Sequence, residues 1–253
     1  MGIEEISQIE LTIVFFDIIF VIISTIIFIK LIFKYFYLRK TVFLTAGLTW
    51  LSLSSTYWSS PLAFFYHVLF ERPINPYFYI AVNNVQTGFI LMFWIYTFCL
   101  LIYPERKKAI LIPFFTIALI LETIMIVLII IAPYYVATIE GYSMIKPGIY
   151  SIIFKFFVLI VVFISLAIFY SKSIKSEKLE IRWKARFLIL AMISYVVSLF
   201  EILYVGLFIE TISIFTLMMI IIFRFFLISS AIEFYLGFFL PNKIANWIIR
   251  KEE

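Results

Sequence analysis

The chain has 253 residues, of which 65% are hydrophobic and 14% charged, and its mean hydropathy is +1.14. Soluble domains are nearer half apolar and a quarter charged, so this composition excludes a water-soluble globular protein and leaves no room for a separate soluble domain. A net charge of +5 is compatible with nucleic-acid binding, but the placement of the basic residues, given below, explains it without a nucleic-acid partner.

Seven apolar stretches are long enough to cross a lipid bilayer. A transmembrane helix needs about 20 mainly apolar residues, because each residue rises about 1.5 Å and the hydrocarbon layer is about 30 Å thick. The predicted helices run over residues 11–36, 42–69, 76–102, 108–132, 147–171, 185–209 and 211–240. The predicted fold class is therefore all-α membrane, with residues 1–240 forming a seven-transmembrane-helix bundle. Pro61 predicts a kink in the second helix.

Lys and Arg gather on one side of this predicted bundle. Sixteen of the 20 lie in or beside the first, third and fifth connections and the tail, two lie on the opposite side, and two lie within spans. Cytoplasmic loops carry an excess of Lys and Arg, so we expect the N-terminus outside and the C-terminus in the cytoplasm. The chain is then a multi-pass protein of the cell membrane, with its basic side facing anionic lipid headgroups.

The tail, residues 241–253, has its own pattern. Ile244, Trp247 and Ile248 lie at spacings of three and four, so they share one face of a helix, and Lys243 lies elsewhere on the wheel. The pattern predicts a short amphipathic helix on the inner membrane surface. A frayed basic tail is the alternative.

Polar side chains from several predicted helices fall at a similar depth. Each is costly inside a bilayer and needs a partner, a cavity or a function. At about 1.5 Å per residue, most lie about 9 to 20 Å below the outer surface. The candidate ligand-binding residues are Asp17, Ser59, Asn83, Asn84, Gln86, Glu122, Lys155, Ser198, Glu201 and Arg224. We expect ion pairs between Glu122 and Lys155 and between Glu201 and Arg224, because depth and chain adjacency permit both.

Two interpretations of these polar residues compete. They either form ion pairs and hydrogen bonds that fix helix packing, or they line a cavity, open to the outside, that binds a small molecule. The second interpretation predicts at least four of the charged and amide side chains on the wall of one pocket between the third, fifth, sixth and seventh helices.

The residue inventory argues against most enzyme classes. One histidine, His67, excludes zinc proteases of the HExxH type and most multi-histidine haem or copper centres. One aspartate, Asp17, excludes paired-aspartate sites, and the single Cys99 excludes an internal disulfide. We expect no metal or cofactor, and an enzyme is the least favoured class.

Two stretches resemble a family of uncharacterised archaeal seven-helix membrane proteins. They are Gly47-Leu48-Thr49-Trp50-Leu51-Ser52-Leu53-Ser54 with Tyr57-Trp58-Ser59-Ser60, and Ser229-Ser230-Ala231-Ile232-Glu233-Phe234-Tyr235-Leu236-Gly237-Phe238-Phe239-Leu240-Pro241. The topology also loosely resembles the seven-helix sensor modules of histidine kinases. These resemblances imply the seven-helix fold but no activity.

The favoured function is that of a receptor-like or sensory protein, which binds an unknown small ligand in the outer half of the bundle and is read by a cytoplasmic protein partner. A small-molecule or ion transporter is the first alternative, and a membrane scaffold or complex subunit is the second. A receptor predicts a dead-end pocket, a transporter predicts polar residues through both halves, and a scaffold predicts a dry bundle.

Overall fold

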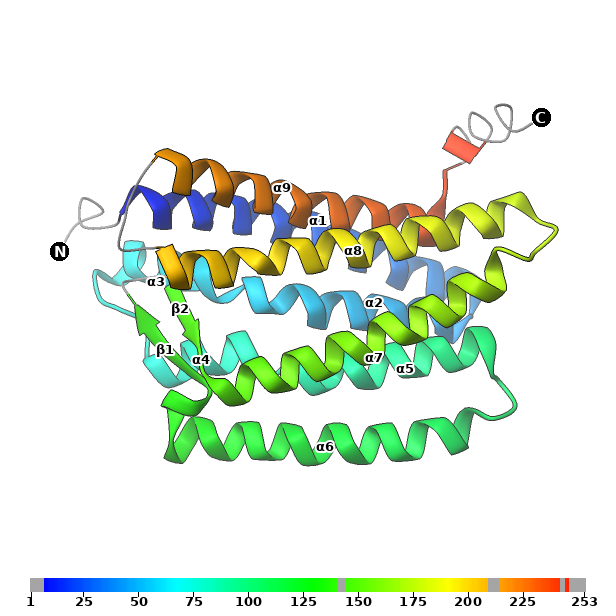
Figure 1. Ribbon diagram of the computed structural model, residues 1–253, viewed down its shortest axis with the longest axis horizontal. Helices are drawn as coiled ribbons and strands as arrows, with labels where there is room; N and C mark the ends of the chain where they lie inside the picture. The colour runs from blue at the N-terminus through cyan, green and yellow to red at the C-terminus, as the bar shows by residue number, and fades with distance from the viewer. Residues whose placement is uncertain (1–6, 141–143, 209–213, 242–243, 246–253) are drawn as a thin grey trace.

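The computed structural model describes residues 7–140, 144–208, 214–241 and 244–245, and almost all of them are helical. The long helices run side by side along one direction (Figure 1). The α-helices are α1 (Gln8–Leu38), α2 (Thr41–Ser54), α3 (Ser59–Phe70), α4 (Pro76–Asn84), α5 (Thr87–Ile102), α6 (Lys107–Ile131), α7 (Ile149–Ser173), α8 (Leu179–Phe208) and α9 (Ile214–Phe239). The 3₁₀ turns are η2 (Ser55–Tyr57) and η3 (Pro133–Tyr135), and the strands are β1 (Ala137–Glu140) and β2 (Met144–Pro147).

Six helical stretches in the described part of the chain are long and apolar enough to cross a membrane. They are α1, α4 together with α5, α6, α7, α8 over Leu179–Glu201, and α9 over Phe215–Phe239. Their outward faces carry large apolar side chains such as Ile112, Ile130 and Phe156, each more than 60% exposed. Such surface suits lipid and not water, so the predicted all-α membrane bundle is confirmed.

The second predicted helix, 42–69, is divided into α2, η2 and α3, and neither α2 nor α3 alone has the length of a span. Pro61 is the third residue of α3. Its ring would clash with the carbonyl of Tyr57, four residues earlier, in a continuous α-helix. Where a kink was predicted, a 3₁₀ turn interrupts the helix just before that proline.

The third predicted helix, 76–102, is also divided, which the sequence pattern did not indicate. α4 ends at Asn84, and α5 begins at Thr87 after a turn at Val85 and Gln86. The amide of Gly88, in the first turn of α5, donates to a Glu122 carboxylate oxygen on α6 at 2.7 Å. A neighbouring helix therefore satisfies one of the amide groups that a helix start leaves without an intrahelical partner.

Two further differences from the predicted elements lie near the ends of the bundle. α8 begins at Leu179 and not at residue 185, because the charged segment before the span is itself helical and carries an ion pair of 2.5 Å between Glu180 and Lys184. Between α6 and α7, β1 and β2 form an antiparallel hairpin, which was not predicted. Most of residues 241–253, where an amphipathic helix is predicted, lies outside the described residues.

The two ends of the bundle differ in charge. The N-terminus of α1, the β1–β2 hairpin and the α3–α4 connection lie at one end, here the hairpin end (Figure 1). The α1–α2, α5–α6 and α7–α8 connections lie at the other, here the basic end. Exposed cations at the basic end include Arg39, Lys40, Arg106, Lys175 and Lys178. The charge asymmetry of the sequence is thus an asymmetry of the fold.

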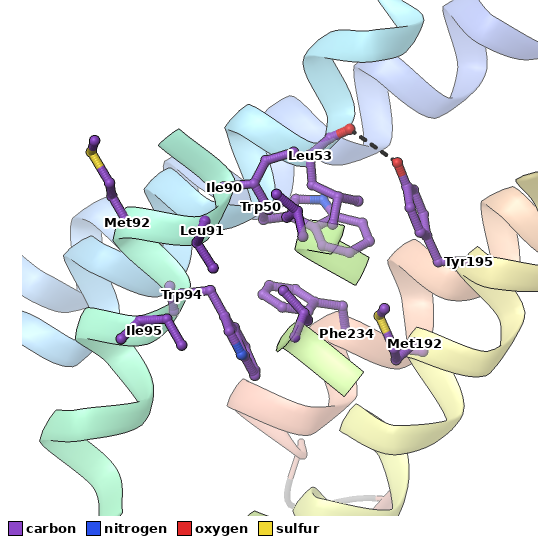
Figure 2. Close-up of a cluster of buried hydrophobic side chains, with 14 of the residues drawn as sticks. Trp50, Leu53, Ile90, Leu91, Met92, Trp94, Ile95, Met192, Tyr195 and Phe234 are labelled. Carbon is purple, nitrogen blue, oxygen red and sulfur yellow. Dashed lines mark hydrogen bonds between the residues drawn. The ribbon is translucent and has the colours of Figure 1, made fainter. Parts of the chain in front are cut away.

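Aromatic and aliphatic side chains pack together around Trp50, Trp94 and Phe234 (Figure 2). On α2 and α5 they lie nearer the basic end than Leu53 and Ile90 do. Trp50 of α2 stacks on Phe234 of α9 with ring centroids 4.2 Å apart. The indole of Trp94 donates to the Ser165 hydroxyl at 2.6 Å. Leu91, three residues earlier on α5, is fully buried. This part of the core, formed around Trp50, Leu91, Trp94 and Phe234 and here called the aromatic core, is buried.

Candidate functional site

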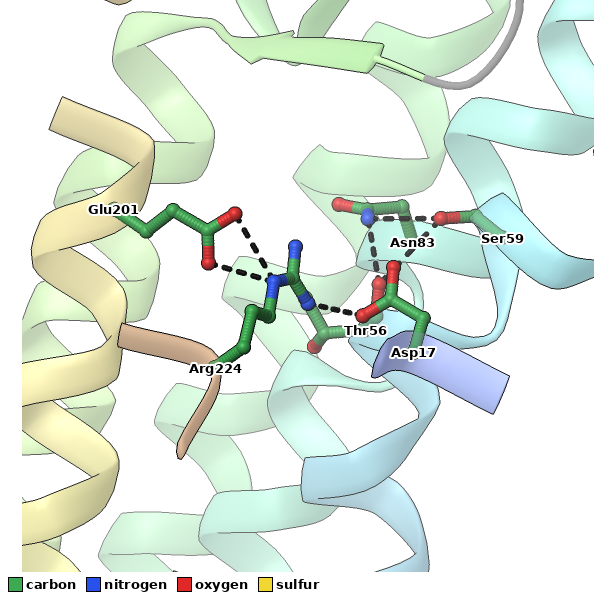
Figure 3. Close-up of polar contacts among 6 residues, drawn as sticks. All are labelled: Asp17, Thr56, Ser59, Asn83, Glu201 and Arg224. Atoms are coloured by element: carbon green, nitrogen blue, oxygen red, sulfur yellow. Dashed lines mark hydrogen bonds and ion pairs between the residues drawn. The ribbon is translucent and has the colours of Figure 1, made fainter. Parts of the chain in front are cut away.

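Three charged side chains meet inside the bundle (Figure 3). Arg224 of α9 approaches Glu201 of α8, with Nε 3.0 Å from Oε1 and 2.7 Å from Oε2. Through Nη1 the same guanidinium donates to Asp17 of α1. Exposure is 1% for Asp17 and 5% for each of the others, so the triad lies away from lipid and water. The predicted pair of Glu201 with Arg224 is confirmed, and Asp17 joins it.

The triad joins α1, α8 and α9 and lies against a group of aromatic rings. The guanidinium carbon of Arg224 lies 5.4 Å from the ring centroid of Tyr57 in η2. The Tyr57 ring makes edge contacts with Phe20, at 5.1 Å, and with Tyr195, at 6.4 Å. A guanidinium over an aromatic face is electrostatically favourable. The 3₁₀ turn η2 therefore places the Tyr57 ring where it stabilises the Arg224 cation.

Asn83 is the centre of a second polar group, and its whole amide is used. Its Nδ2 donates to the Thr56 carbonyl at 2.7 Å and to the Ser59 hydroxyl at 3.1 Å. Its Oδ1 accepts from the Lys155 ammonium at 3.1 Å. The break at η2 frees the Thr56 carbonyl for this contact, since helices interrupted at membrane depth must find partners within the protein.

The predicted ion pair between Glu122 and Lys155 is wrong. Lys155 of α7 donates to the side chain and backbone of Asn83, and Glu122 of α6 accepts from the Gly88 amide. Depth and chain adjacency suggested the pair, but the break between α4 and α5 presents a different partner to each. The second carboxylate oxygen of Glu122, Oε1, is buried without a hydrogen bond.

The remaining candidates are buried or half-buried. Asn84 is 1% exposed and accepts from the Ser151 hydroxyl of α7 at 2.6 Å. Ser198 is buried and donates to the Tyr195 carbonyl at 2.6 Å. Gln86 lies in the turn between α4 and α5 and is half-buried. Most candidates are buried, and Gln86 and Lys155 are half-buried. Beside the triad, the Asn83 group and the Glu122–Gly88 contact, Asn84 bonds to Ser151, and Ser198 bonds to Tyr195.

A cavity of about 50 Å³ lies beside the Asn83 group, between α2, η2, α5, α7 and α8. Its lining residues are Leu53, Thr56, Thr87, Ile90, Lys155, Val158, Leu159, Val162, Tyr195 and Leu199. Among the candidate residues only Lys155 lines this cavity, so the expected wall of four or more charged and amide groups is not found there. Sequence reasoning missed the apolar lining, since apolar residues in a span carry no distinguishing signal.

The charged side chains of the triad and the Asn83 group do not form a metal centre. Within the described residues, no three His, Cys, Asp or Glu side chains converge in a way that could hold a metal ion. In the triad the guanidinium already occupies the space between the two carboxylates. The arrangement is suited to fixing charge and accepting hydrogen bonds.

Fold and site together define a multi-pass helical membrane protein with a buried polar layer, formed by the triad and the Asn83 group, and a small cavity beside it. No protein-family model matches the chain, and no curated protein matches it closely enough to indicate a relative. The resemblance of residues 47–60 and 229–241 to an archaeal family therefore stays a prediction.

Proposed function

We propose that this chain is a receptor-like protein of the cell membrane that binds a small ligand in the cavity beside Lys155. In this proposal the segments α1, α2–α3, α4–α5, α6, α7, α8 and α9 make seven crossings. The basic end faces the cytoplasm, as the excess of Lys and Arg there favours, and the N-terminus lies outside. A cytoplasmic protein partner reads the state of the basic end.

One observation carries the proposal: the cavity is bounded on its basic side by the aromatic core. Leu53 and Ile90 line the cavity, and towards the basic end they are followed by Trp50, Leu91 and Trp94, all of them buried. These side chains are apolar apart from two indole N–H groups. The Thr45 and Thr97 hydroxyls, which are buried in that half of the bundle, are hydrogen-bonded to each other. This mainly apolar surrounding favours a binding site over a channel.

A chain of side-chain contacts connects the cavity to the triad. Tyr195 lines the cavity, its ring contacts that of Tyr57, and Tyr57 lies under the Arg224 guanidinium. Arg224 in turn holds α8 and α9 to α1. A ligand that displaces Tyr195 would thereby alter the packing of three helices, provided that these contacts have two stable arrangements.

A transporter is the second candidate, and the two divided segments favour it. Helices interrupted near the middle of the membrane are common at transport sites. Here η2 is joined to the Asn83 group, and Asn83 itself lies at the end of α4, just before the α4–α5 turn. Transport would further require the aromatic core to open.

The proposal is tested by a thermal-shift screen of the purified full chain in lipid nanodiscs, with small carboxylates, amines, amino acids, sugars and nucleosides. The Val158→Phe variant fills the cavity, and Val127→Phe, on the exposed face of α6, is the matched control. At least one solute should raise the melting temperature of the wild type and Val127→Phe but not of Val158→Phe. A screen in which no solute separates the two variants would contradict a ligand site here.

A further inference from the structure

We infer that the cavity takes a small monocarboxylate, held by the ammonium of Lys155. The inference rests on the proposed function and adds the chemical class of the ligand. It follows from three features of the cavity: the charge of its only ionisable wall residue apart from tyrosine, the size and polarity of the remaining wall, and the fixed position of the ammonium.

Charge comes first. Among the described residues, the Lys155 ammonium meets only neutral oxygens, the side chain of Asn83 at 3.1 Å and its backbone carbonyl at 3.5 Å. Asp17 and Glu201 are held by Arg224, and Glu122 of α6 accepts from the Gly88 amide. A cation in a low-dielectric bundle is stabilised by an adjacent anion. The third N–H of the ammonium remains for that anion.

The size of the cavity and the polarity of its wall then narrow the chemical class of the ligand. A cavity of about 50 Å³ has room for only a few water-sized groups. Apart from Lys155, the α7 and α8 side of the wall is formed by Val158, Leu159, Val162, Tyr195 and Leu199. One charged oxygen pair with a short aliphatic body matches this wall. A phosphate dianion would bring more charge than one ammonium neutralises, and a sugar would leave its hydroxyls against apolar side chains.

The ammonium is held in place by Asn83, which acts as a positioning residue. Because its amide nitrogen is fixed by Thr56 and Ser59, its oxygen has one orientation, towards Lys155. The hydroxyl of Thr87 is already donated to the Asn84 carbonyl at 2.7 Å. Lys155 is therefore the charged donor on the wall, and its position does not depend on the ligand.

The test compares three probes of nearly equal shape, propionate, propionamide and propylammonium, by calorimetric titration of the full chain in nanodiscs. Propionate should bind and the other two should not. Lys155→Met removes the charge and should weaken propionate binding about ten- to a hundredfold, the cost of losing a hydrogen bond to a charged group. Lys175→Met, at an exposed lysine of the basic end, is the matched control and should bind as the wild type does.

A second variant keeps the lysine. Asn83→Asp places a carboxylate where Oδ1 now lies, 3.1 Å from the ammonium, and should exclude propionate by forming an internal ion pair. Unchanged propionate binding in Asn83→Asp or in folded Lys155→Met would overturn the inference, as would equal binding of propionamide. If the carboxylates fail while another solute distinguishes Val158→Phe from Val127→Phe, the inference is wrong and the proposed function stands. If no solute distinguishes them, both are wrong.

Discussion

The Nε atom of Arg224 lies 2.7 Å from Oε2 of Glu201, and this contact joins the middle of α9 to α8. The same guanidinium donates to Asp17, so one cation serves two carboxylates from two other helices. None of the three residues is more than 5% exposed. Their removal should therefore have unequal effects, because each substitution leaves a different charge uncompensated.

The triad predicts an order of stability. Arg224→Met leaves two buried carboxylates together and should lower the free energy of unfolding by about 3–5 kcal/mol. Glu201→Gln leaves Arg224 paired with Asp17 and should cost clearly less. Denaturation in mild detergent, followed by circular dichroism, measures both. Equal losses in the two variants would show that the guanidinium is not the centre of this cluster.

Gly88 predicts a second effect, at the start of α5. A methyl group there would lie 2.7 Å from Oε2 of Glu122 and 3.2 Å from its Cβ, so Gly88→Ala should push the α6 side chain away. The expected loss is about 1–3 kcal/mol, from overpacking and a broken hydrogen bond.

A double-mutant cycle separates that contact from helix propensity. In a Glu122→Ala background, Gly88→Ala should cost less than it does in the wild type, because the carboxylate is gone. Thr123→Ala, next to Glu122 but exposed on α6, should leave the cost of Gly88→Ala unchanged. A cost independent of the Glu122 carboxylate would mean that the clash is with Cβ of residue 122 or with the Ala118 carbonyl, which lie 3.2 and 3.3 Å away.

The long helices could be predicted because their signal is local. Each span is a run of apolar residues, and a proline such as Pro61 acts within its own segment. The turn at Val85 and Gln86 has no such signal. It depends on Asn84 meeting Ser151 and on Gly88 meeting Glu122, which are contacts between helices. Single-segment patterns cannot contain that information.

The candidate site was predictable to the same extent. Burial of charged groups follows from the cost of exposing them to lipid, so the inward direction of Asp17, Glu201 and Arg224 could be predicted. Which groups pair could be predicted only in part. Glu201 and Arg224 lie on consecutive helices, whereas Lys155 turns to Asn83, whose position depends on the broken segments.

The orientation and the number of crossings predict a labelling pattern for single cysteines in a Cys99→Ser background. Cys99 is fully buried, so its replacement should not disturb the surface. Thr138→Cys and Arg72→Cys, exposed at the hairpin end, should react with an impermeant maleimide in intact cells.

Lys40→Cys and Lys175→Cys, exposed at the basic end, should react only after the membrane is permeabilised. The reverse pattern would invert the orientation. Reaction of Lys40→Cys and Arg72→Cys from the same side would mean that α2, η2 and α3 do not cross the membrane, and the count would be six.

The most direct test of the account is the side from which the cavity can be reached. Thr87→Cys, in the Cys99→Ser background, places a thiol on the cavity wall. A small charged methanethiosulfonate reagent is applied to intact cells and, separately, to inside-out vesicles, with Thr138→Cys and Lys175→Cys as controls for each side. The account predicts modification of Thr87→Cys in intact cells and none in inside-out vesicles, because the aromatic core closes the basic side. Modification from the cytoplasmic side, or from neither side, would contradict it.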